Sequence, residues 1–210
     1  MPRVKVTRKS TFIDMTAMCD VAFLLLTFFI LTAKPKVDDP TKAEIPFSSK
    51  TTPVPEDNLA TITVGNINGK STIFYSVTGA DVRTEALKAM AEKYKLPPFT
   101  PVEIQRFSLL EVFGVPIANL KQYLDLRPDE RKGFPVAGIP ADTTASNELG
   151  DWIYTSRQAE KGLHDKDLDV AIKGDRKQEY PVINEIISIL GHQKKFKFDL
   201  ITDLRAAPKK

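Results

Sequence analysis

The chain has 210 residues, of which 42% are hydrophobic, and its 30 basic and 27 acidic residues leave a formal net charge of +3. This length and composition allow one membrane anchor and one compact domain, and they exclude a chain that is disordered throughout. The near balance of charge argues against nucleic-acid binding as the main activity.

The first element is an apolar run over residues 15–33, which reads MTAMCDVAFLLLTFFILTA. It is long enough to cross a hydrocarbon core as a helix. Basic residues precede this run at Arg3, Lys5, Arg8 and Lys9, whereas Lys34 and Lys36 behind it stand beside Asp38 and Asp39. The positive-inside rule therefore predicts a cytoplasmic N-terminus over residues 1–14 and export of everything after residue 33.

A cleaved secretory signal would also begin with basic residues and an apolar core. Two features argue against it. Signal cores seldom hold a carboxylate, and this run contains Asp20. Cleavage after Ala33 would also place Leu31 where a small residue is preferred. We therefore expect an uncleaved anchor.

Asp20 is the single formal charge of the run. At about 100° per residue, Thr16, Asp20 and Thr27 fall within about 40° of one another and form a polar stripe. Acidic residues in spanning helices usually face a partner, a cavity or an ion pathway, and low dielectric favours the neutral carboxyl group, so Asp20 could take up and release a proton. The alternative is that Asp20 reaches interfacial water at the cytoplasmic face and has no transport role.

Residues 34–58 contain Pro40, Pro46, Pro53 and Pro55 among polar residues and show no hydrophobic periodicity. This composition predicts an extended linker, whose residues 37–58 would reach roughly 70 Å at about 3.1 Å per residue. A tether that lets a domain move away from the membrane and an ordinary spacer both fit.

Two β-rich runs follow, at residues 60–64 and 71–76, and the turn residues Gly65, Asn66, Asn68 and Gly69 between them favour a hairpin. Near the C-terminus, residues 168–172 and 196–200 alternate as strands do. Residues 182–190 between them have helical spacing, with Pro181 placed to start the helix and Gly191 to end it. We expect a small exported α+β domain over residues 59–205, with helices on one face of a mixed β-sheet.

The middle of this domain, about residues 79–166, is expected to be an inserted helical region. Helices are predicted over 83–94 and 116–126, and a loop over 127–147. Trp152, with Ile153 and Tyr154, is interpreted as part of the core face of a further amphipathic helix.

Sequence motifs of common enzymes are absent: there is no glycine-rich phosphate loop, no zinc-ligand spacing and no nucleophile elbow. We therefore expect neither enzymatic activity nor a metal or cofactor site. His164 and His192 are predicted to lie on the surface.

The segment DMTAMCDVAFLLLTFFILTAKPK, residues 14–36, resembles the membrane segment of ExbD and TolR proteins. Asp14, Thr16 and Asp20 match the family pattern at the entry to the helix, while Ala17 replaces the usual proline. The resemblance implies that Asp20 is the ion-carrying residue and that the translocated ion is a proton. It also implies a homodimer inside a ring of polytopic ExbB- or TolQ-like subunits.

Two further segments carry weaker resemblance. Ile45 and Pro46 are similar to the hydrophobic-proline pair that follows the membrane helix in the family, which implies a partner-binding role. Val170, Ile172, Asp175 and Tyr180 fill the places of a family signature in the periplasmic domain.

The resemblance implies a single-pass protein of the inner membrane with a periplasmic C-terminal domain. The leading hypothesis is a subunit of an ExbB–ExbD-type motor that couples the proton-motive force to TonB-dependent outer-membrane transport. The alternatives are a TolR-like subunit that maintains the envelope through a TolA-like protein, and a membrane-anchored periplasmic binding or scaffold protein.

Overall fold

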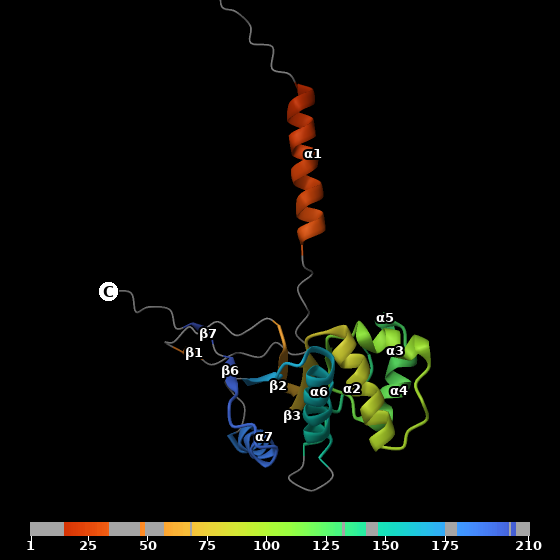
Figure 1. Cartoon of the computed structure of the whole chain (residues 1–210), viewed down its shortest axis with the longest axis vertical. Helices are drawn as coiled ribbons and strands as arrows, with labels where there is room; N and C mark the ends of the chain where they lie inside the picture. Colours follow the sequence, from red (N-terminus) through yellow and green to blue (C-terminus); the bar gives the residue numbers. More distant parts are fainter. Residues whose placement is uncertain are drawn as a thin grey trace, which may run out of the picture. The chain divides into compact units, whose positions relative to one another are not determined.

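The computed structural model describes residues 15–33, 47–48, 57–67, 69–131, 133–141, 147–174, 180–201 and 203–204. The chain divides into two units, residues 1–38 and 39–210, each described here by itself. Unit 1 contains helix α1 (Met15–Thr32), and unit 2 contains an α+β domain (Figure 1). Asp14, Ile45, Pro46, Asp175 and most of the expected linker lie outside the described residues.

The domain is built on a five-stranded sheet of order β4-β3-β2-β5-β6. Its strands are β2 (Leu59–Ile67), β3 (Lys70–Val77), β4 (Val112–Phe113), β5 (Asp169–Gly174) and β6 (Asp199–Ile201). The β2–β3 and β3–β4 pairs are antiparallel, whereas β2–β5 and β5–β6 are parallel, which confirms the expected mixed sheet. A separate parallel pair joins β1 (Phe47–Ser48) to β7 (Asp203–Leu204).

The expected hairpin is present and is tighter than the sequence suggested. β2 and β3 pair from Ala60↔Val77 to Ile67↔Lys70, so only residues 68 and 69 connect them. Gly69 has φ +80°, a left-handed conformation that glycine adopts without the steric cost of a Cβ atom. Gly65 and Asn66, which were expected in the turn, continue strand β2.

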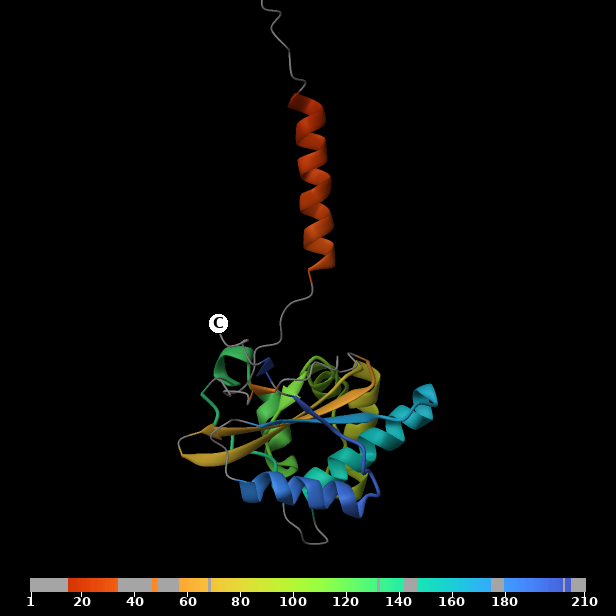
Figure 2. The same ribbon diagram turned by 90° about the vertical axis from the view of Figure 1, so that its left-hand side faces the viewer.

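Alternate residues of the central strands point to one face of the sheet, where they meet helices. Helices α2 (Ala80–Lys93), α6 (Glu148–His164) and α7 (Tyr180–His192) contribute buried side chains to the same cluster. In Figure 2, α6 and α7 lie next to each other on one side of the strands. The strand residues of this cluster are Ala60, Ile62, Val64, Ile73, Tyr75, Val77, Val170 and Ile172. The expected arrangement of helices on one face of the sheet is therefore confirmed.

An aromatic group joins the middle of the chain to this core. The ring of Trp152, which is 1% exposed, lies 4.8 Å from that of Phe113 and 5.8 Å from that of Phe107, between ring centroids. Phe113 in turn contacts Tyr75 of β3 at 5.9 Å. The predicted core position of Trp152 is confirmed, and the helical region packs into the same core as the strands.

Three shorter helices complete this region: α3 (Pro101–Ser108), α4 (Ile117–Asp125) and α5 (Pro128–Arg131). They gather on one side of the domain (Figure 1). Helix α3 was not predicted, although its start carries a capping box in which Thr100 and Glu103 bond each other's backbone N–H groups. The prediction of a loop throughout 127–147 was wrong at α5, a single turn too short for a detectable hydrophobic period.

Two C-terminal boundaries also differ from expectation. The last strand of the sheet begins only at Asp199, and Phe196 is 77% exposed, so the alternation over 196–200 did not mark a strand along its whole length. Helix α7 continues past Gly191 to His192, and the left-handed residue behind it is Lys194, at φ +56°. A helix end without a left-handed glycine gives sequence patterns little to detect.

Glu148 is a buried carboxylate that connects α6 to the start of α4. It is 7% exposed, and its Oε1 accepts hydrogen bonds from the backbone N–H of Ile117 at 2.7 Å and from the indole N–H of Trp152 at 3.4 Å. Burial raises the pKa of Glu148, and the two hydrogen bonds only partly oppose this. Burial thus disfavours the ionised form of Glu148, and the two N–H donors reduce this free-energy cost.

We expect Glu148→Ala to lower the free energy of unfolding by about 2 kcal/mol, because two buried N–H groups would lose their acceptor. Glu148→Gln retains a carbonyl oxygen for both donors and should destabilise less. Denaturant unfolding of the full chain, followed by fluorescence of its only tryptophan, measures both.

A comparison of the wild type with Glu148→Gln tests the raised pKa of Glu148. Since the folded-state pKa is raised above 4.5, the folded state binds more protons than the unfolded state, and wild-type stability should fall as pH rises from 4.5 through the raised pKa. Glu148→Gln should lose this part of the pH dependence. Identical pH profiles for the two proteins would contradict the assignment.

Candidate functional site

Helix α1 is apolar and has no buried residue. Its 18 residues have a mean hydropathy of 2.0. At 1.5 Å per residue it is about 27 Å long, close to the thickness of a bilayer's hydrocarbon core. By length and composition it is able to cross a membrane, and it fits a single-pass inner-membrane protein.

The structure places Asp20 in the second turn of α1, in the same uninterrupted helix as Thr16 and Thr27. The helical spacing that groups these three residues on one stripe therefore applies. The hydroxyl of Thr27 donates to the backbone oxygen of Leu24 at 3.0 Å, which satisfies it within the helix. A threonine bonded in this way adds little cost to a membrane-spanning helix.

Asp20 differs from Thr27 in this respect. Within the part of the chain that the structure describes, its carboxylate forms no hydrogen bond or ion pair. A carboxylate in an apolar helix costs a few kcal/mol by insertion scales unless a partner, a cavity or water receives it. Asp20 therefore requires a neighbour that α1 does not supply.

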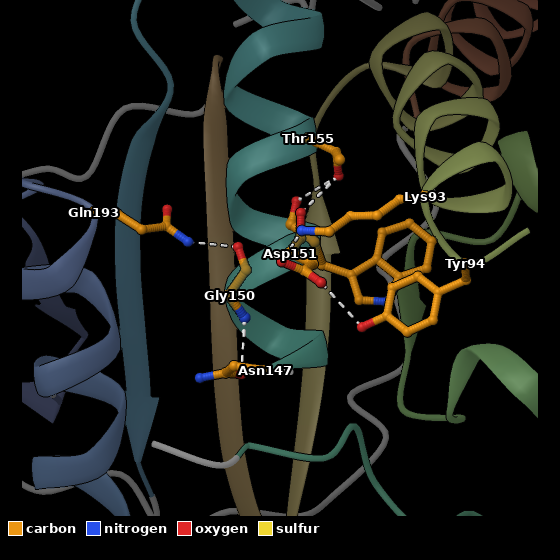
Figure 3. A network of polar contacts seen from close by, with 8 residues as sticks. Lys93, Tyr94, Asn147, Gly150, Asp151, Thr155 and Gln193 are labelled. Atoms are coloured by element: carbon orange, nitrogen blue, oxygen red, sulfur yellow. Dashed lines mark hydrogen bonds and ion pairs between the residues drawn. The ribbon is translucent and has the colours of Figure 1, made fainter. Parts of the chain in front are cut away.

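A network of polar contacts surrounds the start of α6 (Figure 3). One oxygen of Asp151 accepts from the Lys93 ammonium group, and the other accepts from the Tyr94 hydroxyl at 3.0 Å. Asn147 caps the helix by accepting from the backbone N–H of Gly150 at 3.0 Å, while the amide of Gln193 donates to the Gly150 oxygen. These bonds tie α2 and the end of α7 to α6.

This network has a structural role. Each oxygen of Asp151 accepts a hydrogen bond from a residue at the end of α2, so the carboxylate holds α6 against that helix. Partial burial, followed by the bond to Asp151, raises the pKa of Tyr94, which keeps the phenol protonated as a donor. Sequence analysis did not single out these residues, although Asn147 followed by acidic residues is a recognisable helix start.

The other residues considered from the sequence form no reactive centre. His164 lies at the end of α6, where its ring nitrogens contact Glu160 at 3.0 Å and Asp81 at 3.1 Å, and His192 is exposed. In the described ranges, no three His, Cys, Asp or Glu side chains come together as a metal site would require. Val170 and Ile172 are buried strand residues in the sheet.

An apolar helix of spanning length with one carboxylate, followed in the chain by an α+β domain with a mixed sheet, fits a single-pass membrane-anchored protein. The family model described as "Biopolymer transport protein ExbD/TolR" matches residues 7–110, about half of the chain, and includes all of α1. The chain belongs to the ExbD/TolR family. Searches among curated proteins and among solved structures found no match.

Members of this family are non-enzymatic energising subunits of biopolymer transport and generally work with ExbB or TolQ and with TonB or TolA. The matched segment extends through α2 and α3, into the region that was expected to be an insertion. Val170, Ile172, Asp175 and Tyr180 lie beyond it, and their assignment to a family signature stays a prediction.

The position of the stripe on α1 can be tested by cysteine cross-linking in a Cys19→Ser background, which removes the only native cysteine. Thr27→Cys lies on the stripe and should form cross-links to a neighbouring membrane protein or a second copy. Leu25→Cys lies about 160° away around the helix and should form far fewer. Gel electrophoresis of native membranes treated with a thiol-directed photo-cross-linker measures cross-linking at both positions, and equal cross-linking from the two would rule out a stripe that faces protein.

Proposed function

We propose that this chain is the ion-carrying subunit of an ExbB–ExbD-type inner-membrane motor that couples the proton-motive force to TonB-dependent outer-membrane transport. The observation that carries the proposal is the carboxylate of Asp20, which has no partner in the described ranges and is the single formal charge in an apolar helix of spanning length. Family membership supports an energising role in transport and leaves the choice between the ExbD and TolR types to experiment.

Coupling rests on the two charge states of Asp20. The neutral carboxyl group tolerates an apolar neighbour, whereas the ionised form requires polar groups or water. Proton uptake and release would therefore change which surface the stripe packs against. Each proton that crosses the membrane releases about 2.3 kcal/mol per 100 mV, which is comparable to the cost of placing the charge in an apolar helix. This energy is enough to shift or rotate α1 relative to its neighbours.

The proposed topology follows from the charges that flank α1. Four basic residues lie within the first nine positions, so the N-terminus is cytoplasmic by the positive-inside rule and the α+β domain is periplasmic. In this orientation Asp20, five residues after Met15, lies about 7.5 Å along the helix from its cytoplasmic end. The α+β domain would then be on the side where a TonB-like protein acts.

The proposed partners are the polytopic ExbB- or TolQ-like protein, a second copy of this chain, and a TonB- or TolA-like protein. A polytopic partner would cover the apolar surface of α1 and supply the polar neighbour that Asp20 lacks among the described residues. Asp14, at the membrane entry, and the Ile45–Pro46 pair, as a partner-binding element, are part of the proposal by resemblance alone.

One observation favours a second candidate function. Because Asp20 lies near one end of α1, its carboxylate could reach interfacial water, and the chain would then be an anchored binding or scaffold protein. In a TolR-like role, by contrast, Asp20 would still carry the ion, and only the periplasmic partner and the task would differ.

Asp20→Asn in the native host should abolish energy-dependent outer-membrane uptake, because an amide cannot take up and release a proton. Asp20→Glu keeps the titratable group and should retain part of the uptake. Cys19→Ser, one residue away and about 80° from the stripe centre, is the matched control and should behave as wild type. Uptake of a ferric siderophore is measured at equal amounts of membrane-inserted protein, and unchanged uptake in Asp20→Asn would refute an ion-carrying role in this uptake.

The ExbD-type and TolR-type roles separate on a second measurement with the same variants. We expect Asp20→Asn to lose siderophore uptake while resistance to detergents and the release of periplasmic proteins stay near wild type. Loss of envelope integrity with normal uptake would instead assign the TolR-type role. Normal behaviour in both assays would favour the scaffold.

A further inference from the structure

A pocket of about 260 Å³ opens in the α+β domain where α3, the end of α4 and α5 meet. It is lined by three arginines and three leucines, with no acidic side chain among the described residues that line it. The lining residues are Arg106, Leu109, Leu110, Leu126, Arg127 and Arg131. Three positive charges thus meet an apolar wall in a space that can hold a side chain and a carboxylate.

Two of the arginines are held in place by the end of α4. Arg106 donates from Nη1 to the backbone oxygens of Leu124 at 2.8 Å and Asp125 at 3.3 Å, and Arg131 donates from Nη2 to the Leu124 oxygen at 3.1 Å. The Arg131 guanidinium also lies over the ring of Tyr123, 5.3 Å from its centroid. Both groups are therefore pre-positioned, so binding a ligand would cost little side-chain entropy.

These bonds leave much of the donor capacity unused, because each guanidinium carries five N–H groups. The Nε of Arg131 is buried and has no hydrogen-bond partner. In the described ranges, none of the three guanidinium groups forms an ion pair with a carboxylate; Glu130 instead accepts from the backbone N–H of Arg127 at 3.0 Å. Arg127 is exposed and free to approach a ligand.

The apolar wall is accessible as well. Leu109, at the end of α3, is 75% exposed, and Leu126 is partly exposed beside it. An exposed leucine next to unpaired guanidinium groups matches the composition of protein–protein contacts, in which arginines and apolar anchors are enriched.

We propose that this arginine–leucine pocket binds an acidic segment of a protein partner, with a carboxylate on the guanidinium groups and a neighbouring apolar side chain against the leucines. Guanidinium groups bind carboxylates through paired N–H donors, which gives the contact geometric as well as electrostatic selectivity. A membrane surface presents its phosphates in a plane and suits protruding cations better than cations fixed within a pocket. The proposal does not depend on the role of Asp20.

The test uses the full chain in neutral detergent and a fluorescent peptide of alternating glutamate and leucine, with a lysine–leucine peptide as the charge-reversed probe. We expect the acidic peptide to bind with a Kd below about 1 mM, and its affinity to fall as the salt concentration rises. The basic peptide should not bind. Arg127→Gln should weaken binding about fivefold, and Leu109→Ser should also weaken it. Both side chains are exposed, so folding should be preserved.

Lys88→Gln is the matched control, because it removes one exposed cation from α2, beside a different pocket. It should leave the affinity unchanged. The proposal is overturned if the acidic peptide does not bind at about 1 mM, or if Lys88→Gln weakens binding as much as Arg127→Gln. It is also overturned if anionic vesicles or inorganic phosphate bind in an Arg127-dependent way while the peptide does not.

Discussion

A carboxylate on an apolar helix needs a polar group, a cation or water as a neighbour, and in this chain that carboxylate is Asp20. Helix α1 has no other formal charge, has no buried residue, and offers the carboxylate no partner within the described residues. Lipid can cover the leucines and phenylalanines but not the charge. Helix α1 therefore needs a neighbour for Asp20 that lipid cannot supply. Membership of a family whose members work with polytopic subunits agrees with this need.

Two carboxylates of the α+β domain find their partners within the domain. Glu148 accepts from two N–H groups in the core, Asp151 is paired with Lys93 and Tyr94, and the aromatic group around Trp152 connects the helical region to the sheet. These carboxylates are buried or paired and serve packing. The contrast with Asp20 separates a structural carboxylate, whose partners lie in the same fold, from one whose partner must come from elsewhere.

The arginine–leucine pocket shows the same distinction with the opposite charge. Arg106 and Arg131 are partly used by the end of α4, yet no carboxylate of the described domain neutralises them. Each of the two units thus presents a charged feature that has no ion-pair partner among the described residues: an acidic group in the apolar helix and a basic pocket in the domain. A protein that converts an ion gradient into work on a partner needs both an ion site and a contact for that partner.

The sequence by itself determined the elements that local patterns encode. The apolar run, the Asp20 stripe, the hairpin and the strand–helix–strand order near the C-terminus depend on residue spacing within short segments, and the helix and the mixed sheet were found as expected. Only the tertiary structure decided what depends on residues distant in the chain. Three features leave no periodic pattern in the sequence. They are the burial of Glu148 against Ile117, the pairing of Asp151 with Lys93 and Tyr94, and the meeting of three arginines at the end of α4. Short elements such as α5 and β4 were missed for a related reason, since their stability comes from neighbours in space and not from their own pattern.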